Sequence, residues 1–366
     1  MLFKYKYVNH EIEKFQKYSD FLFNHVWTKA RADFDSSKLN QYPELKIIYE
    51  TLHYDDGDWA QFFNSSIENI YAEFLKLGKA QRKELKGWYK TNNRIHSLCI
   101  NTDLKPVRYQ EIEARYPKLS LLLKTFYERL YGSTSPFILA IFGNIKDLKK
   151  SHYEDFIDAN FDGHEGICPF CGLNSIKGND HSKLEAYDHF LPKGKYPFNS
   201  INFKNLAPMC HECNSSYKLE QNPLINIDPL SNEILRRKAF YPYSLENWNL
   251  DIKVELLNPD LKTLTSEEIG ITMTCNGKNE EIESWKEVYG IEERYRAKLL
   301  GKHAGKKWYI DLKDGIHVAK KILKNDDLSK EDWYKLLLNQ CSEDMMADCN
   351  FLKKAFFEEC TRLDIA

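Results

Sequence analysis

The chain has 366 residues, and because a single hydrophobic core stops growing at about 250 to 300 residues, we expect more than one lobe. Hydrophobic residues make up 42% and aromatic residues 14% of the chain, which excludes a disordered protein. The formal net charge of -2 excludes binding of polyanions through the charge of the whole molecule, so any nucleic-acid surface must be local.

No apolar run approaches the roughly 20 residues that span a bilayer. The opening stretch "MLFKYKYVNHEIEKF" becomes polar too early for a signal peptide. We therefore expect a cytoplasmic protein with no membrane partner.

Apolar residues recur at helical spacing from about His10 to Ala159, which predicts a helical domain over residues 1–160. Turn-forming stretches near Gly57, Gly78, Pro106 and Pro136 divide it into four to six helices. We give its aromatic residues no function beyond core packing.

Short strands and turns are expected over residues 161–235, where Gly, Pro, Asn and Cys are frequent. Residues 236–366 begin with two alternating stretches, "WNLDIKVELL" and "IGITMTC", and then return to helical spacing. Asn276-Gly277 is a turn signal, and Ser329 with Asp332 is typical of a helix N-terminus. The fold class is therefore α+β, predominantly helical, with a strand and helix region at the C-terminal end.

Four of the nine cysteines form two Cys-x-x-Cys pairs, a spacing that suits metal chelation. They are Cys168, Cys171, Cys210 and Cys213. Four thiolates fill the tetrahedral shell of a zinc ion and leave no position for substrate, so a zinc ion here would be structural. The alternative is two unrelated pairs of thiols. The 38 residues between the pairs, 172–209, are long enough to house a separate site.

Inside this segment, Asp188 and His189 stand together in "LEAYDHFLPK", which is typical of a short strand ended by Pro192. Such a pair alone is more often structural than catalytic. Asn205 follows in "FKNLAP", and Asn214 directly follows Cys213.

This order of residues resembles the HNH family of endonucleases, also called the ββα-metal or His-Me finger family. The resemblance covers about 60 residues and implies a central ββα-metal nuclease module with a structural zinc ion. It implies that His189 is the general base that takes a proton from water, a role that suits a neutral imidazole with a pKa of about 6.5. It also implies that Asp188 and Asn214 hold one divalent cation through oxygen, Mg²⁺ or Mn²⁺ by ligand preference. Asn205 would tether the loop between the two strands and orient the base.

Three further residues could contact phosphate, and for each the alternative is an exposed side chain without a function. Lys218 ends the motif "C-N-x-x-x-K" and could equally be a solvated lysine. His181 and His211 could approach phosphate or could simply be exposed. His211 could also replace Asn214 as the metal ligand.

The nuclease segment is electrically neutral, with six Lys or Arg and six Asp or Glu between Glu165 and Gln221. Affinity for nucleic acid should therefore come from basic residues in another segment of the chain. Residues 293–325 carry ten Lys or Arg against three Asp or Glu, interleaved with Tyr295, Trp308 and Tyr309. This run is either a nucleic-acid track or a solvated helix face.

The wider stretch from Ala186 to Lys218, with "IESWKEVYGIEERYR" downstream, is similar to the HNH subunits of Septu-type anti-phage systems (PtuB-like). That similarity implies a nuclease acting beside an ATPase partner on DNA or RNA. The N-terminal helical region would then serve in partner docking or restraint of the nuclease.

Two other functions stay open. One is a non-catalytic zinc module that binds nucleic acid or protein. The other is a nuclease toxin that is silent until a partner activates it.

Overall fold

The computed structural model describes residues 1–132, 145–228, 230–231, 233–324 and 327–365. These residues form two compact units. The N-terminal unit comprises Lys4–Gly166 and Ile176–Ser244, and the C-terminal unit comprises Met1–Phe3, Ile167–Ser175 and Leu245–Ala366. The three domains expected from the sequence, with boundaries at residues 160 and 235, stay a prediction.

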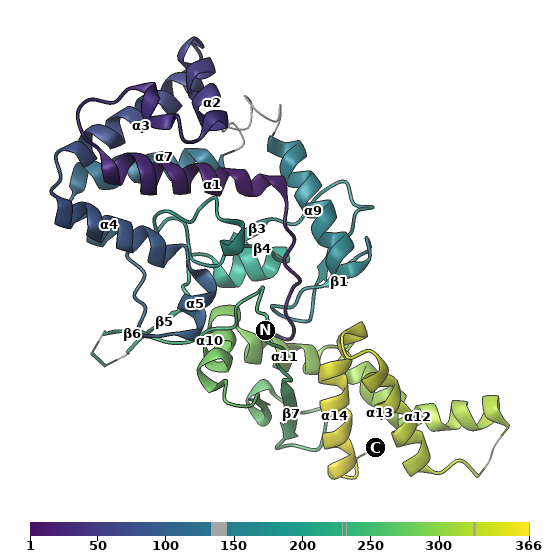
Figure 1. The fold of residues 1–366 in the computed structure, drawn as a ribbon. Coiled ribbons are helices and arrows are strands. Elements are labelled where there is room, and N and C mark those ends of the chain that lie inside the picture. Colours follow the sequence, from purple (N-terminus) through teal and green to yellow (C-terminus); the bar gives the residue numbers. More distant parts are fainter. Residues whose placement is uncertain (133–144, 229, 232, 325–326, 366) are drawn as a thin grey trace. The chain divides into compact units, whose positions relative to one another are not determined.

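Helices dominate the first part of the N-terminal unit, as the apolar spacing predicts (purple and blue in Figure 1). They are η1 (Glu11–Glu13), α1 (Lys14–Phe21), η2 (Leu22–Val26), η3 (Trp27–Lys29), η4 (Ser36–Leu39), α2 (Pro43–His53), α3 (Asp58–Leu75), α4 (Lys79–Asn92), α5 (Ile95–Ile100), α6 (Tyr109–Glu113), α7 (Pro117–Tyr131) and α9 (Ile145–Phe161). Gly57 and Gly78 are the N-cap residues of α3 and α4, as their turn chemistry predicts. The break expected near Pro136 lies outside the described residues.

Aromatic side chains fill the core between these helices. Trp27, Phe63 and Phe126 are fully buried, and the Trp27 indole donates a hydrogen bond to the carbonyl of Ile67 at 3.1 Å. A buried indole N–H needs such a partner, because an unpaired buried donor costs about 1–3 kcal/mol. The expectation that these aromatics serve packing is confirmed.

Short strands follow the helices and pair two by two. They are β1 (Gly166–Ile167) with β2 (Ser175–Ile176), β3 (Tyr187–His189) with β4 (Leu206–Pro208), and β5 (Ile225–Ile227) with β6 (Ile234–Arg236). A 3-10 turn, η5 (Phe203–Asn205), leads into β4, and η6 (Cys213–Lys218) follows it. The β3–β4 hairpin and η6 thus succeed one another as strand, strand and helical turn.

The loop between β3 and β4 is packed against the N-terminal helices. Phe198 has a positive φ of 79°, and its ring lies 5.1 Å from the ring of Phe23 and 5.3 Å from that of Tyr89 on α4. Asn92 at the end of α4 donates to the Pro197 carbonyl at 3.2 Å. The helices therefore share one core with this loop and fix its conformation.

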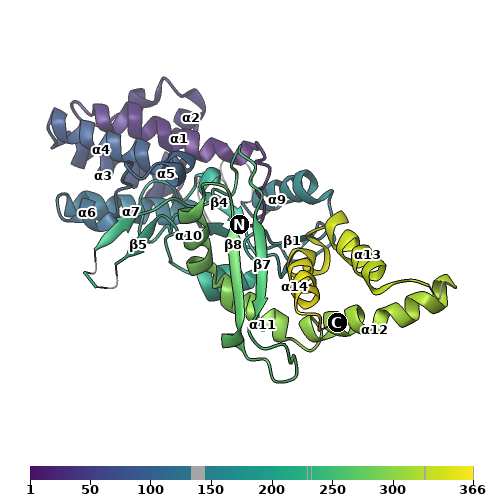
Figure 2. The ribbon, with the colours of Figure 1, turned by 90° about the horizontal axis from the view of Figure 1, so that it is seen from below.

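The C-terminal unit contains a longer two-stranded sheet, β7 (Asp251–Leu256) with β8 (Ile269–Thr274), paired antiparallel from Asp251 opposite Thr274 to Leu256 opposite Ile269. Figure 2 shows both strands, with α14 beside β7. Ile269, Ile271 and Met273 are buried on one face, so the predicted alternation is confirmed. Gly277 makes the predicted turn with a φ of +69°.

Helices complete the C-terminal unit. They are η7 (Ser266–Glu268), α10 (Asn279–Tyr289), α11 (Ile291–Leu300), α12 (Gly305–Leu323), α13 (Lys330–Glu343), η8 (Ala347–Cys349) and α14 (Asn350–Arg362). The Ser329 hydroxyl accepts the Asp332 N–H at 3.0 Å, which confirms the predicted cap of α13.

The fold is α+β and mostly helical, with small antiparallel sheets, as expected. Among the described residues, no helix is long and apolar enough to cross a membrane.

Candidate functional site

Asp188 and His189 lie on β3, where Asp188 pairs with Ala207 and His189 with Leu206 across the hairpin. Both are buried, at 6% and 8% exposure. Burying a carboxylate beside an imidazole is costly unless specific partners hold both groups. The partners of each side chain therefore define what the site can do.

The His189 imidazole is held by a backbone carbonyl. Its Nε2 lies 2.9 Å from the oxygen of Ser200. Because a carbonyl only accepts, Nε2 carries the hydrogen and the neutral ring keeps its free lone pair on Nδ1. Ser200 is itself fixed, since its hydroxyl donates to the Tyr127 carbonyl on α7 at 2.9 Å.

Burial lowers the pKa of His189 to about 3. The nearby charges of Lys193, Lys218 and Lys149 lower it further, while the Ser200 carbonyl opposes the shift. The expectation of an unperturbed pKa of about 6.5 is therefore wrong. The imidazole is neutral at physiological pH, which is the protonation state that a proton acceptor requires.

Asn205 is completely buried at the end of η5, directly before β4, and binds the preceding loop. Its Oδ1 accepts the Leu191 N–H at 2.8 Å, and its Nδ2 donates to the carbonyls of Leu191 at 3.1 Å and Asn199 at 3.4 Å. These bonds close the loop that carries Ser200 and thereby support the imidazole of His189.

Lys218, at the end of η6, faces the two β3 residues. Its ammonium lies 2.9 Å from Asp188 Oδ2 and donates to the His189 carbonyl at 2.8 Å. The side chain is fully buried, so the alternative of a solvated lysine is wrong. With both contacts inside the protein, Lys218 holds the strand and the helical turn together.

The helical turn η6 is a π-helix: the Leu219 N–H bonds to the Asn214 carbonyl, five residues earlier, at 3.1 Å. π-Helical turns are rare in proteins, and those that occur are often found at functional sites. Leu219, which ends this turn, has a φ of +47°.

Asp188 is under-satisfied for a buried carboxylate. Its Oδ2 has the ion pair with Lys218 but no well-directed hydrogen bond. Burial raises the pKa of Asp188, and the charge of Lys218 opposes that shift. A carboxylate oxygen is the kind of ligand that a hard divalent cation prefers. Asn214, half-buried as the second residue of η6, offers a further oxygen.

Three residues that the sequence did not indicate lie near the imidazole of His189. The Tyr131 ring lies edge-on to His189 with ring centroids 4.5 Å apart. The ammonium groups of Lys149 and Lys193 lie 3.9 and 4.5 Å from the centre of the Tyr131 ring. They come from the end of α7, from α9 and from the β3–β4 loop, so no local spacing could have indicated them.

The two lysines bring positive charge to the site. Burial, together with Lys193, lowers the pKa of Lys149 to about 8. Burial raises the pKa of Tyr131 to about 12, with a contribution from the charge of Asp188. Lys149 and Lys193 are half-buried, so both combine partial exposure with proximity to His189.

The two flanking histidines are exposed. His181 Nε2 lies 3.2 Å from the carboxylate of Glu165, and His211 stands between the second pair of cysteines. Neither belongs to a cluster of metal-ligand residues in the described part of the chain.

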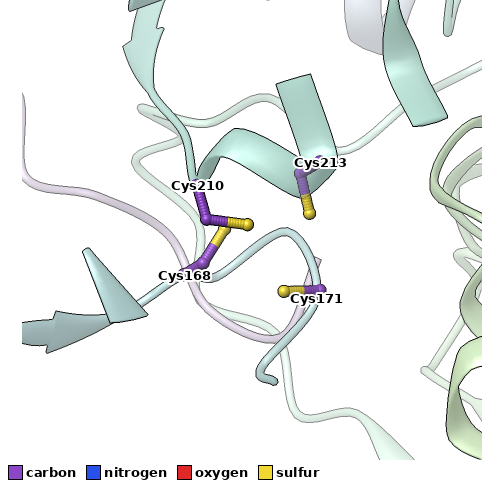
Figure 3. Close-up of side chains that lie close together, drawn as sticks. All are labelled: Cys168, Cys171, Cys210 and Cys213. Atoms are coloured by element: carbon purple, nitrogen blue, oxygen red, sulfur yellow. The ribbon is translucent and has the colours of Figure 1, made fainter. Parts of the chain in front are cut away.

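The four cysteines of the two Cys-x-x-Cys pairs come together (Figure 3). Cys168, Cys171, Cys210 and Cys213 are buried, and their sulfurs all lie within 4.8 Å of one another. A tetrahedral zinc ion with Zn–S bonds of about 2.3 Å places its sulfurs about 3.8 Å apart, so the cluster can hold zinc. None of the nine cysteines forms a disulfide.

The basic run 293–325 lacks the exposed aromatic residues that base stacking requires. Tyr295 and Trp308 are buried, at 0% and 6% exposure. Tyr309 is half-buried and donates its hydroxyl to the Ile365 carbonyl at 2.6 Å. Helical packing turns these rings inward, which favours the solvated helix face over the nucleic-acid track for this segment.

Comparisons with known proteins give partial matches. The Septu protein PtuB of Bacillus thuringiensis is 35% identical over 72 residues, which cover 18% of this chain and 27% of that protein. Protein ea31 of Escherichia phage lambda is 33% identical over 125 residues, which cover 33% of this chain and 32% of that protein. The chain thus spans less than a third of the length of each relative. No model of a protein family matches the chain, and no solved structure does.

Proposed function

We propose that this chain is a metal-dependent endonuclease of the HNH type that hydrolyses phosphodiester bonds in DNA or RNA. The observation that carries the proposal is the environment of His189: a neutral imidazole on the first strand of a hairpin, held through Nε2 by the Ser200 carbonyl, with Asp188 beside it. The succession of β3, β4 and η6 agrees with the ββα order that the sequence resemblance implies.

In this proposal His189 accepts a proton from the attacking water at Nδ1. The Ser200 carbonyl stabilises the positive charge that develops on the ring, because it accepts the hydrogen of Nε2. Asn205 acts as a positioning residue, since its amide closes the loop that carries Ser200.

Asp188 and Asn214 would hold the divalent cation, Mg²⁺ or Mn²⁺, through carboxylate and amide oxygens. The cation would polarise the phosphate and stabilise the leaving oxygen. The buried Asp188 carboxylate would give an oxygen to this cation beside the ion pair that its Oδ2 forms with Lys218. Lys218 keeps the η6 turn against Asp188.

Lys149 and Lys193 replace Lys218 in our proposal as contacts for the scissile phosphate. Both ammonium groups lie beside the Tyr131 ring that touches His189, and both side chains are partly exposed. Cations placed where negative charge develops stabilise the transition state of phosphoryl transfer.

The four-cysteine cluster would hold a structural zinc ion, a role that supplies folding energy and no open coordination position. The similarity to a Septu protein supports a role in bacterial anti-phage defence beside an ATPase partner, in the cytoplasm. This biological setting is part of the proposal.

The experiment is a cleavage assay of the purified chain on duplex DNA, single-stranded DNA and transfer RNA. Each polymer is incubated without added metal, with Mg²⁺ and with Mn²⁺. We expect cleavage of at least one polymer that requires added metal and that Asp188→Ala abolishes.

A nuclease that a partner must activate gives a different result. The isolated chain is then inactive, and cleavage or cell killing appears on co-expression with the ATPase and is lost in Asp188→Ala. Activity that persists in Asp188→Ala in both settings contradicts the proposal.

A further inference from the structure

A surface groove lined almost entirely by cations lies on the N-terminal unit and shares no lining residue with the candidate site. It has a volume of ≈ 770 Å³, and its lining consists of Thr28 and six basic residues. These are Lys29, Arg31, Lys79, Arg82, Lys83 and Lys86. No carboxylate lines this groove. Such a concentration of one charge contrasts with the net charge of -2 of the whole chain.

Helix α4 supplies most of this charge. Lys79, Lys83, Lys86 and Lys90 follow one another at intervals of four, three and four residues, so they share one face of the helix. They extend over about 17 Å at 1.5 Å per residue. Lys86 and Lys90 also line a second hollow of ≈ 420 Å³, whose lining includes Lys17 and the carboxylate of Asp20, so the lysine row continues past the groove.

The exposed cations of this surface have no carboxylate partner within the described residues. Lys29, Arg31, Lys79 and Lys83 are exposed and form no ion pair there. Arg82 is different, because its guanidinium donates to the carbonyls of Leu77, Leu75 and Ala30 and so builds the floor of the groove.

The electrostatic environment agrees with crowded positive charge. Burial lowers the pKa of Lys86, and the neighbouring charges of Lys90 and Lys29 lower it further. The pKa of His25 is likewise lowered by burial and then by Lys29 and Lys86. A polyanion would relieve this repulsion.

The opposite face of α4 touches the loop of the candidate site. Tyr89 packs on Phe198, and Asn92 donates to the Pro197 carbonyl, two residues before Asn199 in the loop that Asn205 closes. One rigid helix therefore carries the lysine row on its outer face and supports the site on its inner face.

We infer that this groove binds the sugar-phosphate backbone of a nucleic acid. An open groove with repeated cations along an axis fits a linear polyanion, and the lack of aromatic lining fits binding that does not depend on base sequence. The inference rests on the proposed function only in taking the bound polymer to be the substrate. The groove would supply the affinity for nucleic acid that the proposed nuclease segment, with zero net charge, lacks.

The test measures binding separately from cleavage, in the full-length His189→Ala protein without added divalent metal. Fluorescence anisotropy with a labelled 20-base-pair duplex and a 20-nucleotide single strand gives the dissociation constant at several salt concentrations. The test variant adds Lys29→Gln, Lys79→Gln and Lys83→Gln. The matched control adds Lys302→Gln, Lys306→Gln and Lys313→Gln, three exposed positions of the basic run 293–325 that remove the same charge.

We expect the groove variant to bind at least about tenfold more weakly at 0.1 M salt. The slope of log K against log salt should fall by about 2 to 3, since each phosphate contact contributes about 0.9. The control variant should bind like the parent, and both melting temperatures should stay unchanged because these side chains are exposed.

Three results overturn the inference. One is unchanged binding and salt slope in the groove variant. Another is a loss of binding in the control variant alone. The third is tight, groove-dependent binding to vesicles containing phosphatidylserine without binding to either nucleic acid. Because no cleavage is measured, failure of the proposed catalysis leaves this test intact.

Discussion

His189 and Lys193 show how single residues acquire their properties from chain segments far apart in the sequence. The imidazole of His189 is buried by Tyr131 of α7 and oriented by Ser200 of the loop. Lys193 follows His189 by only four residues, yet its relation to the site comes from the Tyr131 ring that it contacts. Residue identity alone therefore gives neither the pKa of His189 nor the phosphate contacts that we propose.

Replacing Lys193 by Gln tests the proposed phosphate contact. We expect the single-turnover cleavage rate to fall about tenfold, since a cation near the developing charge is lost. The nearby Lys195 is a matched control, because its ammonium donates to the Glu220 carbonyl at 2.8 Å instead. An equal loss in Lys195→Gln, or no loss in Lys193→Gln, would show that Lys193 has no specific role.

His152 provides a prediction about stability and pH. Burial lowers its pKa to about 3, and its Nδ1 lies 2.5 Å from the Tyr187 hydroxyl. The folded state thus favours the neutral ring, whose stabilisation is complete above pH 6.5 and is lost as the pH falls from 6.5 toward 3. At pH 5 the loss should be roughly 1–2 kcal/mol.

Urea unfolding of the wild type and His152→Gln at pH 7 and pH 5 measures this loss. At pH 7 the variant should have a lower free energy of unfolding than the wild type. At pH 5 the gap between the two free energies of unfolding should be smaller. A difference that stays constant between the two pH values contradicts the assignment.

At the scale of elements, the first Cys-x-x-Cys turn depends on the glycine that follows it. Gly172, which directly follows Cys171, has a φ of +69°, and a Cβ there would lie 2.1 Å from the side chain of Leu2. The first turn therefore requires glycine both for its backbone conformation and for its close packing.

Cys168→Ser and Cys210→Ser should lower the zinc content and the melting temperature together, because metal binding contributes folding energy. Cys341→Ser, at a buried cysteine of α13, is the control: it perturbs packing but should keep the zinc. Atomic absorption and thermal unfolding give the two readouts. Full zinc content in Cys168→Ser would mean that the four cysteines do not form one zinc site.

At the scale of the whole molecule, the elements that local pattern specifies were predictable. The helical spacing before residue 160, the alternation in β8 and the cap at Ser329 each reflect neighbours in the sequence, and the structure confirms them. The gathering of four cysteines was predictable as well, since thiols paired at this spacing have few uses other than metal binding.

Features that arise from tertiary packing were not predictable. The burial of Lys218 depends on the η6 turn meeting β3, and the burial of Trp308 depends on how α12 packs. The basic groove combines η3 with α4, whose charges in the sequence are separated by about 50 residues. Residues 293–325, by contrast, are basic as a continuous stretch of sequence, a pattern that is visible without the fold.

The most direct test of the account is the cleavage rate of His189→Ala relative to the wild type under the metal that supports activity. His53→Ala, an exposed histidine at the end of α2, is the matched control. We predict a loss of about 100-fold or more for His189→Ala, as expected for removal of a general base, with normal zinc content and no loss in the control. Cleavage by folded His189→Ala at the wild-type rate would contradict the assignment of this site as the catalytic centre.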